Sequence, residues 1–352
     1  MTPIKLTGEP FEYGRAHGAA LRTEVQAHLA AWLGSLAEAG VGEPRAYVAG
    51  MLAATDFRTA IDRHTPDLWQ ELQGIASGAE VPADLLFGLQ LLDEEWAYRV
   101  RLGREGRLEK CSSLAIVPAS GPTIIGQNMD LGGYTEGFAA LLSPPQALVF
   151  TVAGMIGLMG VNASAVAVCV NSLPQLPSAP EGLPVAFVLR RLLQAACLAE
   201  AADLALTLPH ATNQHYLIAE PGAARSFEAA AEGVVEYIPA NPARVLHTNH
   251  PLAAKGAPET AEARANSVAR LATLTERLAA GEVGAGEIKA ALCSRDDPQN
   301  PVSRVRGEPG GLVAFTTGSM LSVLAADRVE TWVSPGPPTR VPYENFVLRT
   351  ES

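Results

Sequence analysis

A long stretch without any charged residue, Gly137–Pro180, constrains the fold of this chain more than any other feature. Such a stretch must be removed from water, either in a membrane or inside a protein core. Ala147–Val170 within it is long enough to cross a bilayer, but glycines, Asn162 and Ser164 interrupt it, and no Lys or Arg flanks it. We therefore predict two buried strands joined by a turn, and no membrane segment.

The composition excludes several other classes of protein. The 352 residues are 48% hydrophobic and 18% charged, which suits one large domain or two ordinary ones and not a disordered chain. The formal net charge is −11 and Lys and Arg are not clustered, so we expect no nucleic acid partner. The four cysteines make no disulfide framework, and residues 1–14 do not resemble a secretory signal. We therefore expect a cytoplasmic protein.

Residues 1–110 carry apolar residues at helical spacing. The helices predicted from that spacing are 11–39, 48–61, 68–75 and 83–98. Residues 99–110 are charged and short of large apolar groups, which predicts an exposed connector.

At Cys111 the pattern changes to short apolar runs. Residues 111–117 and 123–129 flank a turn rich in Pro and Gly, which predicts a hairpin. Further strands are predicted at 147–152, 165–171, 215–219, 233–238, 245–249, 312–317, 321–325 and 329–333, and further helices at 185–208 and 261–280. Two groups of strands with helices outside them predict an α+β fold, a four-layer α/β/β/α sandwich over residues 111–352. A helical segment of residues 1–110 precedes it.

Motifs of the common enzyme classes are absent from the sequence. It contains no G-x-G-x-x-G, no G-x-x-x-x-G-K-[ST], no H-E-x-x-H and no G-x-S-x-G. His247 and His250 are spaced like metal ligands, but on a strand their side chains would point to opposite faces. We therefore expect neither a metal site nor a cofactor.

Cys111 is the residue with the most informative surroundings. It stands where the charged connector meets the first predicted strand, and pairing within the hairpin would bring Asp130 back near it. A carboxylate in so apolar a region needs a partner, and a free α-amino group would be one. Cys169, Cys197 and Cys293 have the surroundings of small hydrophobic residues. An isolated Cys at a strand start is usually structural too, so the case for a nucleophile depends on these neighbours.

The sequence C-S-S at 111–113 followed by G-Q-N-M-D at 126–130 resembles the signature of the isopenicillin-N acyltransferase family. These are autoproteolytic cysteine N-terminal-nucleophile hydrolases related to the bile-salt hydrolases. Five further segments resemble motifs of the family and follow in family order: 10–18, 160–173, 247–251, 266–270 and 335–343.

The resemblance implies a zymogen of the N-terminal-nucleophile hydrolase fold that cuts itself between Lys110 and Cys111. Residues 1–110 would become a small subunit that stays associated with the catalytic segment 111–352. Cys111 would be the nucleophile, and Asp130 would hold the new ammonium group or the substrate.

Further residues follow from the same motifs. Asn171 and Asn249 match oxyanion or active-site positions, although Asn at a strand end also commonly caps a turn. The expected supporting or substrate-binding residues are Ser113, Asn128 and Arg270, with Ser113 as a scaffold residue. On a helix, Arg270 would equally suit a position facing solvent.

Four positions depart from the pattern. Lys110, Ser112 and Met129 stand where Gly, Thr and Trp are expected, and Gln127 stands where the bile-salt branch carries Arg. Bile-salt hydrolysis is therefore the less favoured branch.

The proposed cut has a clear chemical reason. A thiol with a pKa near 8.5 is only about a few per cent thiolate at neutral pH. Freeing the α-amino group of Cys111, with an ordinary pKa of about 7.7–8.0, would create a base suited to that thiol. We therefore predict a cysteine amidase or acyltransferase that acts on carbon–nitrogen amide bonds of a small-molecule amide or acyl donor.

Two alternatives stay open. The same scaffold could serve as a bile-salt or N-acyl-amide hydrolase, or as an unprocessed, non-catalytic binding relative. The sequence also leaves open whether the chain forms a homo-oligomer.

Overall fold

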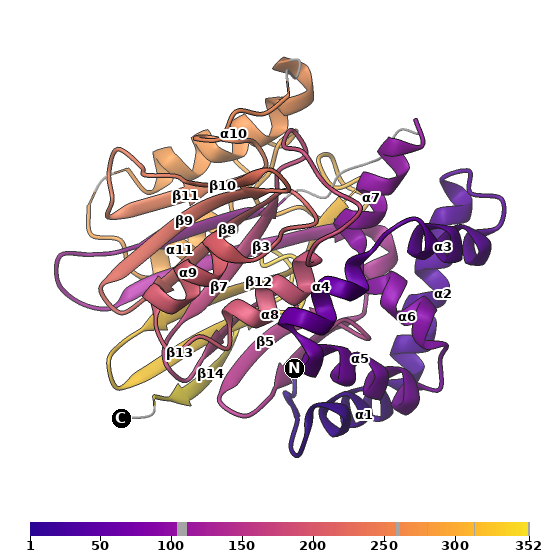
Figure 1. The fold of residues 1–352 in the computed structure, drawn as a ribbon. Coiled ribbons are helices and arrows are strands. Elements are labelled where there is room, and N and C mark those ends of the chain that lie inside the picture. The colour runs from indigo at the N-terminus through magenta and orange to yellow at the C-terminus, as the bar shows by residue number, and fades with distance from the viewer. Residues whose placement is uncertain (104–110, 258–260, 280, 313, 351–352) are drawn as a thin grey trace.

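The computed structural model describes residues 1–103, 111–257, 261–279, 281–312 and 314–350 (Figure 1). These residues form two β-sheets. The eight-stranded sheet has the order β1-β4-β5-β6-β7-β8-β9-β10, and the six-stranded sheet has the order β11-β2-β3-β12-β13-β14. Within each sheet the neighbours pair antiparallel, except that β1 runs parallel to β4.

The strands of the eight-stranded sheet are β1 (Ile4–Lys5), β4 (Ala139–Ser143), β5 (Ala147–Val152), β6 (Met159–Asn162), β7 (Ala167–Ser172), β8 (Gln214–Glu220), β9 (Ala223–Ala230) and β10 (Gly233–Glu236). Those of the six-stranded sheet are β2 (Ser112–Ile116), β3 (Thr123–Gly132), β11 (Arg244–His247), β12 (Ala314–Leu324), β13 (Arg328–Ser334) and β14 (Glu344–Arg349). The predicted hairpin is confirmed as β2 and β3, with Ser112 opposite Asn128.

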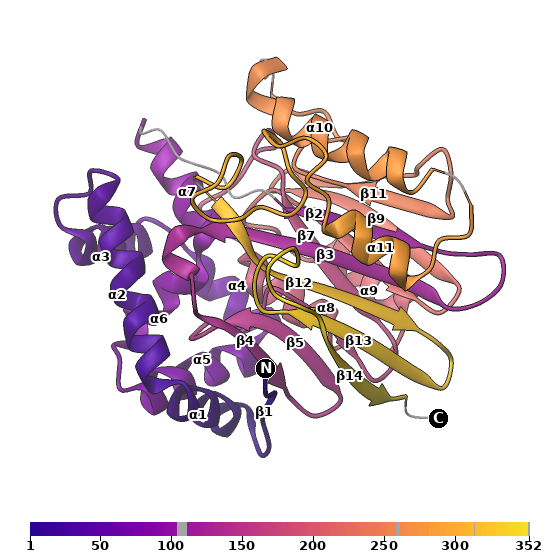
Figure 2. The same ribbon diagram turned by 180° about the vertical axis from the view of Figure 1, so that it is seen from behind.

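The two sheets pack face to face. Phe150 of β5 lies so close to Gly318 of β12 that a Cβ atom there would be 2.0 Å from the Phe150 ring. Helices α8 (Val185–Leu192) and α9 (Leu198–Thr207) cover the outer face of the eight-stranded sheet. Helices α10 (Ala261–Arg277) and α11 (Ala285–Leu292) cover the outer face of the other (Figure 2). The predicted α+β fold with four α/β/β/α layers is confirmed.

The N-terminal part is helical as predicted, but it is divided more finely. Its helices are α1 (Pro10–Ala20), α2 (Arg22–Glu38), α3 (Pro44–Ala53), α4 (Phe57–His64), α5 (Pro66–Ala79), α6 (Ala83–Gln90) and α7 (Leu92–Arg101). The predicted helices 11–39 and 83–98 were wrong as single elements, since they break at Leu21 and Leu91, whose backbone angles are not helical. A break of one residue hardly changes the apolar spacing, so the spacing does not reveal it.

Other predictions also differ from the structure. The stretch Ala147–Val170, predicted as two strands, contains β5, β6 and most of β7, because a short strand such as β6 has too few residues to stand out in a continuous apolar run. The predicted helix 48–61 is α3 and α4, because Asp56 caps α4: its side chain accepts the Thr59 backbone N–H at 3.4 Å and the Thr59 hydroxyl at 2.8 Å. The predicted helix 185–208 is α8 and α9. The predicted strands 312–317 and 321–325 are one strand, β12, which keeps its pairing with β3 across a bulge between Thr316 and Gly318. Of the predicted connector 99–110, α7 takes residues up to Arg101, and 104–110 lie outside the described residues.

Helices α1 and α5 cross with their backbones in contact. Gly14 and Gly18 of α1 face Gly74 and Gly78 of α5. A Cβ atom on Gly14 would lie 1.7 Å from the carbonyl oxygen of Glu71, so no larger residue fits there. This contact gives the glycines of the N-terminal motif at 10–18 a structural role.

The N-terminal helices also hold the loop that follows β5. The Gln90 side chain donates to the Gly154 carbonyl at 2.9 Å and accepts from the Ile156 N–H at 2.9 Å. The Gly154 N–H donates to His17 Nε2 at 3.2 Å, and Gly154 itself has a φ of +90° that favours glycine. The core of the molecule is therefore continuous between residues 1–103 and the sheets.

None of the described helices is both long enough and apolar enough to cross a membrane.

Candidate active site

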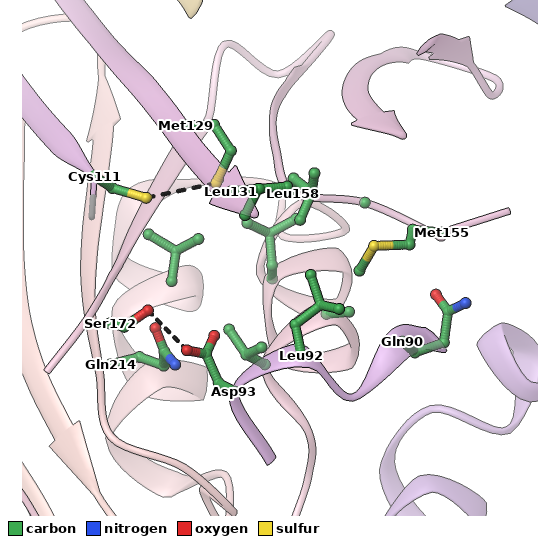
Figure 3. Close-up of a pocket in the computed structure, with 15 residues that line it drawn as sticks. Gln90, Leu92, Asp93, Cys111, Met129, Leu131, Met155, Leu158, Ser172 and Gln214 are labelled. Carbon is green, nitrogen blue, oxygen red and sulfur yellow. Dashed lines mark hydrogen bonds between the residues drawn. The ribbon is translucent and has the colours of Figure 1, made fainter. Parts of the chain in front are cut away.

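Cys111 lies directly before β2, on the face of the six-stranded sheet that meets the other sheet. The register of the hairpin places it opposite Met129, and its Sγ lies 3.6 Å from Met129 Sδ (Figure 3). The residue is only 3% exposed, and it lines a small cavity.

The backbone nitrogen of Cys111 is held by a side chain distant in sequence. It donates a hydrogen bond to Asn249 Oδ1 at 2.8 Å. Asn249 follows β11, which pairs with β2, and its amide nitrogen donates to the Ser172 carbonyl at 3.0 Å. The Ser267 hydroxyl accepts from the backbone N–H of Asn249 at 2.7 Å. These bonds fix the amide plane, so its oxygen points at the nitrogen of Cys111.

Arg270 of α10 is fully buried beside the same residue. It donates to the Cys111 carbonyl at 2.5 Å, to Ser112 Oγ at 2.7 Å and to Asn249 Oδ1 at 2.8 Å. Burial lowers the pKa of Arg270 to about 10, with the charge of Asp130 opposing this shift, so the guanidinium stays protonated at neutral pH. The alternative expectation of a solvent-facing Arg270 is wrong, because α10 turns this residue toward the sheet.

Asp130 lies one residue beyond Met129 on β3 and is fully buried. Side chains alternate along a strand, so its carboxylate lies on the Arg270 side of the sheet, away from the thiol. The Thr316 hydroxyl donates to its Oδ1 at 2.7 Å, and Arg304 Nε lies 3.9 Å from its Oδ2. The hairpin thus brings Asp130 near the backbone of Cys111, on the other face from its sulfur.

Asn128 shares that outer face and contacts the scaffold. Its amide nitrogen donates to the carbonyls of Leu292 and Val302 at 2.8 and 2.9 Å. Gln127 faces the opposite sheet, where its side chain bonds both backbone groups of Val170 in β7. Gln127 therefore ties the two sheets together at the position where the bile-salt branch carries Arg.

Asn171 of β7 lies between the sheets, beside Ser113. Its Oδ1 is 2.6 Å from the Ser113 hydroxyl, which donates to it, and 2.9 Å from Nδ1 of His215. Burial lowers the pKa of His215 well below its ordinary value, so the ring is neutral and Nδ1–H donates. Its Nε2 then accepts from the Ser226 hydroxyl at 2.7 Å. With two donors on its oxygen, Asn171 keeps a buried amide nitrogen that has no hydrogen-bond partner among the described residues.

A buried histidine pair continues this network. The rings of His215 and His247 stack with centroids 3.6 Å apart and planes 8° apart. His247 Nε2 lies 3.0 Å from Glu228 Oε1, and Glu228 also accepts backbone N–H groups from the loop after His250. His247 and His250, whose spacing resembles that of metal ligands, have different partners. The ring of His250 lies 2.8 Å from Ser267 Oγ, away from Glu228. The described residues contain no group of three His, Cys, Asp or Glu that could hold a metal.

The cavity at Cys111 is small, about 30 Å³, and mostly apolar. Its polar lining comes from Gln90, Asp93, Ser172 and Gln214 (Figure 3). The Ser172 hydroxyl donates to Asp93 Oδ1 at 2.7 Å, and burial raises the pKa of Asp93.

Sequence reasoning missed Asp93, Ser172, Gln214 and His215 as members of the site. One signal was present, since Asp93 opens three consecutive acids in an otherwise apolar segment. Acidic residues are common in the first turn of a helix, which masks that signal. Burial raises the pKa of the Cys169 thiol well above its ordinary value, as expected for a structural cysteine. Lys110 lies outside the described residues.

Several known proteins resemble this chain. One curated relative is the 40 kDa form of acyl-coenzyme A:6-aminopenicillanic-acid-acyltransferase from Emericella nidulans, which is 26% identical over 99% of this chain and 96% of the relative. The solved structures include a mutant conjugated bile acid hydrolase from Clostridium perfringens, with 12% identity, a TM-score of 0.40, and coverage of 68% of this chain and 92% of the hydrolase. They also include penicillin V acylase from Agrobacterium tumefaciens, with 13% identity, a TM-score of 0.34, and coverage of 68% and 86%.

A family model matches more than half of the chain. It covers residues 118–306 and is described as acyl-coenzyme A:6-aminopenicillanic acid acyl-transferase. The matched region contains Asp130, Asn171, Asn249 and Arg270 and begins shortly after Cys111. The chain therefore belongs to the acyl-coenzyme A:6-aminopenicillanic acid acyl-transferase family.

Proposed function

We propose that this enzyme of acyl and amide chemistry is a self-cleaving cysteine amidase or acyltransferase whose nucleophile is Cys111. The supporting observation concerns the backbone nitrogen and the sulfur of Cys111, the two groups that the mechanism uses. The nitrogen of Cys111 donates to Asn249 Oδ1 at 2.8 Å, while its sulfur faces the cavity. A residue with only a packing role has no need of an amide acceptor on its nitrogen and a buried guanidinium on its carbonyl.

Self-cleavage between Lys110 and Cys111 comes first. The sulfur of Cys111 attacks the carbonyl carbon of Lys110, the carbon–nitrogen bond breaks, and the nitrogen takes the thiol proton. The resulting thioester is hydrolysed by water, which leaves a carboxylate on Lys110 and restores the thiol. Asn249 Oδ1 then accepts a hydrogen bond from the new ammonium group, and Asp130 supplies negative charge on the same side of the sheet.

Turnover repeats this chemistry on a substrate. The α-amine, with an ordinary pKa of about 7.7–8.0, takes the thiol proton as the sulfur attacks an acyl carbonyl. The amine then protonates the leaving nitrogen, and water or an amine accepts the acyl group from the sulfur. The amide nitrogens of Asn171 and Asn249 are the candidate oxyanion donors, and one such donor typically lowers the barrier by about 3 kcal/mol.

Residues 1–110, here called the pro-segment, remain bound to residues 111–352 after the cut. Arg190 of α8 supports this, because it forms a buried two-pronged ion pair with Glu71 of α5 at 2.8 and 2.9 Å. Separating the two pieces would expose that pair, the shared core and the bonds of Gln90. A pair so buried is costly to break.

Replacing Cys111 with Ala tests the proposed function. We expect the purified protein to give pieces of about 12 and 25 kDa, in proportion to their lengths within 36.9 kDa, with Cys at the start of the larger piece. Cys111→Ala should give one full-length band and no turnover. Cys293→Ala removes a partly buried thiol elsewhere and is the matched control. An active Cys111→Ala protein, or an active wild-type chain uncut at residue 110, would contradict the mechanism, and an uncut, inactive wild type would favour the non-catalytic alternative.

A further inference from the structure

Four polar side chains meet between the two sheets, close in the chain to Cys111. In the six-stranded sheet, Ser113 of β2 lies opposite His247 of β11. In the eight-stranded sheet, Asn171 of β7 lies opposite His215 of β8. The two pairs face each other, because the Ser113 hydroxyl donates to Asn171 Oδ1 at 2.6 Å and the two imidazole rings stack with centroids 3.6 Å apart. All four side chains are fully buried, and the proposed acyl transfer assigns no part to the histidines.

His247 is the charged member of this group. Its Nδ1 lies 2.8 Å from the Thr248 carbonyl oxygen, and its Nε2 lies 3.0 Å from Glu228 Oε1. Burial acts to raise the pKa of Glu228, but hydrogen bonds from His247 and from backbone N–H groups of the loop after β11 lower it overall, so this carboxylate is ionised. A carbonyl oxygen and a carboxylate oxygen can only accept, so both ring nitrogens donate. His247 is therefore an imidazolium ion paired with Glu228.

His215 is the neutral member. Burial, reinforced by the charge of His247, lowers the pKa of His215 well below its ordinary value. A neutral imidazole has one N–H group and one acceptor nitrogen. With the proton on Nδ1, the ring donates to Asn171 Oδ1 at 2.9 Å and accepts the Ser226 hydroxyl on Nε2 at 2.7 Å. The other tautomer would turn a nitrogen lone pair toward the amide oxygen, so these contacts favour the Nδ1–H form.

Two donors on one oxygen fix the orientation of the Asn171 side chain. Ser113 and His215 both donate to Oδ1, and flipping the amide would turn its N–H groups against the Nδ1–H of His215. The amide nitrogen that remains is buried, with no hydrogen-bond partner in the part of the chain that the structure describes. A donor held in place beforehand needs no reorganisation when negative charge develops on a substrate oxygen.

We propose that His215 is a positioning residue for acyl transfer: its Nδ1–H holds the Asn171 amide so that the amide nitrogen is presented to the oxyanion. This inference rests on the proposed function, in which Cys111 is the nucleophile and Asn171 an oxyanion donor. Ser113 supplies the second bond to the amide oxygen, and the imidazolium of His247 keeps the stacked ring of His215 neutral. His215 thus acts through Asn171 and not on the substrate itself.

Two substitutions at one position separate positioning from packing. His215→Asn places an amide nitrogen where Nδ1 lies, so it can still donate to Asn171. His215→Gln carries its amide to the place of Nε2, so it reaches Ser226 instead. The probe is the best substrate in a series of straight-chain acyl p-nitroanilides.

The two variants should differ in kcat and not in KM. For His215→Gln we expect kcat to fall by about tenfold to a hundredfold with KM within about twofold, because the oxyanion donor is present but no longer held. His215→Asn should keep kcat within about threefold of the wild type. Equal losses in both variants, or a change in KM alone, would overturn the proposal.

A double-mutant cycle tests whether His215 acts through Asn171. In an Asn171→Ala background no amide is left to position, so His215→Gln should change kcat by no more than about twofold. A general structural role would lower kcat by the same factor in both backgrounds, and that result would overturn the proposal. Urea unfolding of each variant checks that it is folded under the assay conditions.

NMR tests the hydrogen bond without turnover. Long-range proton–nitrogen spectra of Cys111→Ala, isotope-labelled in histidine, show which ring nitrogens carry protons, and adding His215→Asn or His247→Asn identifies the two sets of signals. We expect a neutral Nδ1–H ring for His215 and an imidazolium for His247. A proton on Nε2 of His215 would refute the proposal even if Cys111 is the nucleophile. Turnover of the probe by Cys111→Ala would instead refute the proposed function, whatever the spectra show.

Discussion

Arg270 is a buried cation at the centre of the candidate site. It donates hydrogen bonds to Cys111, Ser112 and Asn249, and a sequence motif does not reveal these contacts. The sequence could indicate that Cys111, Asn249 and Arg270 lie together, because their motifs recur in family order. It could not show that Arg270 reaches the carbonyl of Cys111, since that contact depends on how α10 packs against β2. Asp93 was even harder to recognise from the sequence, because its hydrogen-bond partner Ser172 lies far along the chain, in the eight-stranded sheet.

Asn171 provides a residue-scale prediction about catalysis. Asn171→Asp preserves the shape and the oxygen that accepts from Ser113 and His215, but it removes the unpartnered amide nitrogen. We expect kcat to fall by roughly a hundredfold to a thousandfold with little change in KM, as for loss of one oxyanion donor. Steady-state kinetics of the mature enzyme check this, with the exposed Asn345→Asp as control. A rise in KM at constant kcat would contradict the assignment.

Glu94 provides a prediction about pH and stability. Burial, reinforced by the Asp93 carboxylate, raises the pKa of Glu94 from 4.5 to about 7. The folded protein therefore binds this proton more tightly than the unfolded chain, and stability is lost as pH rises from 4.5 through 7. The expected loss is about 3 kcal/mol.

Glu94→Gln has no proton to release, so the stability difference between it and the wild type should change by that amount over this range. Urea unfolding of both proteins at each pH measures it, and the titrating groups that do not interact with Glu94 cancel in the difference. A difference that stays constant with pH would contradict the raised pKa.

At the scale of elements, the crossing of α1 and α5 depends on missing side chains. A Cβ on Gly14 would meet the backbone of Glu71 at 1.7 Å, and backbone cannot move aside as a flexible side chain can. We expect Gly14→Ala to destabilise the protein by on the order of 3 kcal/mol.

Gly50→Ala in α3 is the matched control. Its new methyl group would meet only the Tyr98 hydroxyl at 3.8 Å, so the change should stabilise by about 0.5–1 kcal/mol. Denaturant unfolding separates the two. Equal effects of both changes would show that Gly14 is not required for the close crossing of α1 and α5.

The elements themselves show what patterns can and cannot predict. Strand runs such as β5 were predicted accurately, because an apolar run bounded by turn residues has few alternatives. The short β1 was missed, because two residues carry no periodicity and its pairing with β4 joins distant parts of the chain. The break between α6 and α7 was missed for a similar reason, as it depends on a single residue, Leu91.

At the scale of the whole molecule, the four layers could be predicted from the alternation of helix and strand groups. The resemblance led us to expect that the pro-segment stays associated, but the contacts that hold it, such as Gln90 with the loop at Gly154, could not be predicted. From those contacts we expect the two pieces of the cut protein to elute together in size-exclusion chromatography and to separate only in denaturant. Elution of the larger piece alone under native conditions would contradict a shared core.

The parallel pairing of β1 with β4 has a thermodynamic consequence for the mature enzyme. The chain before the cut supplies an edge strand and part of the core to the chain after it. If the junction is severed as proposed, melting releases two molecules in place of one, so the midpoint temperature should rise with protein concentration. The uncut Cys111→Ala chain should melt at a temperature independent of concentration. Cleavage would thus make unfolding a bimolecular equilibrium in place of a unimolecular one, and dilution would lower the activity of the cut enzyme.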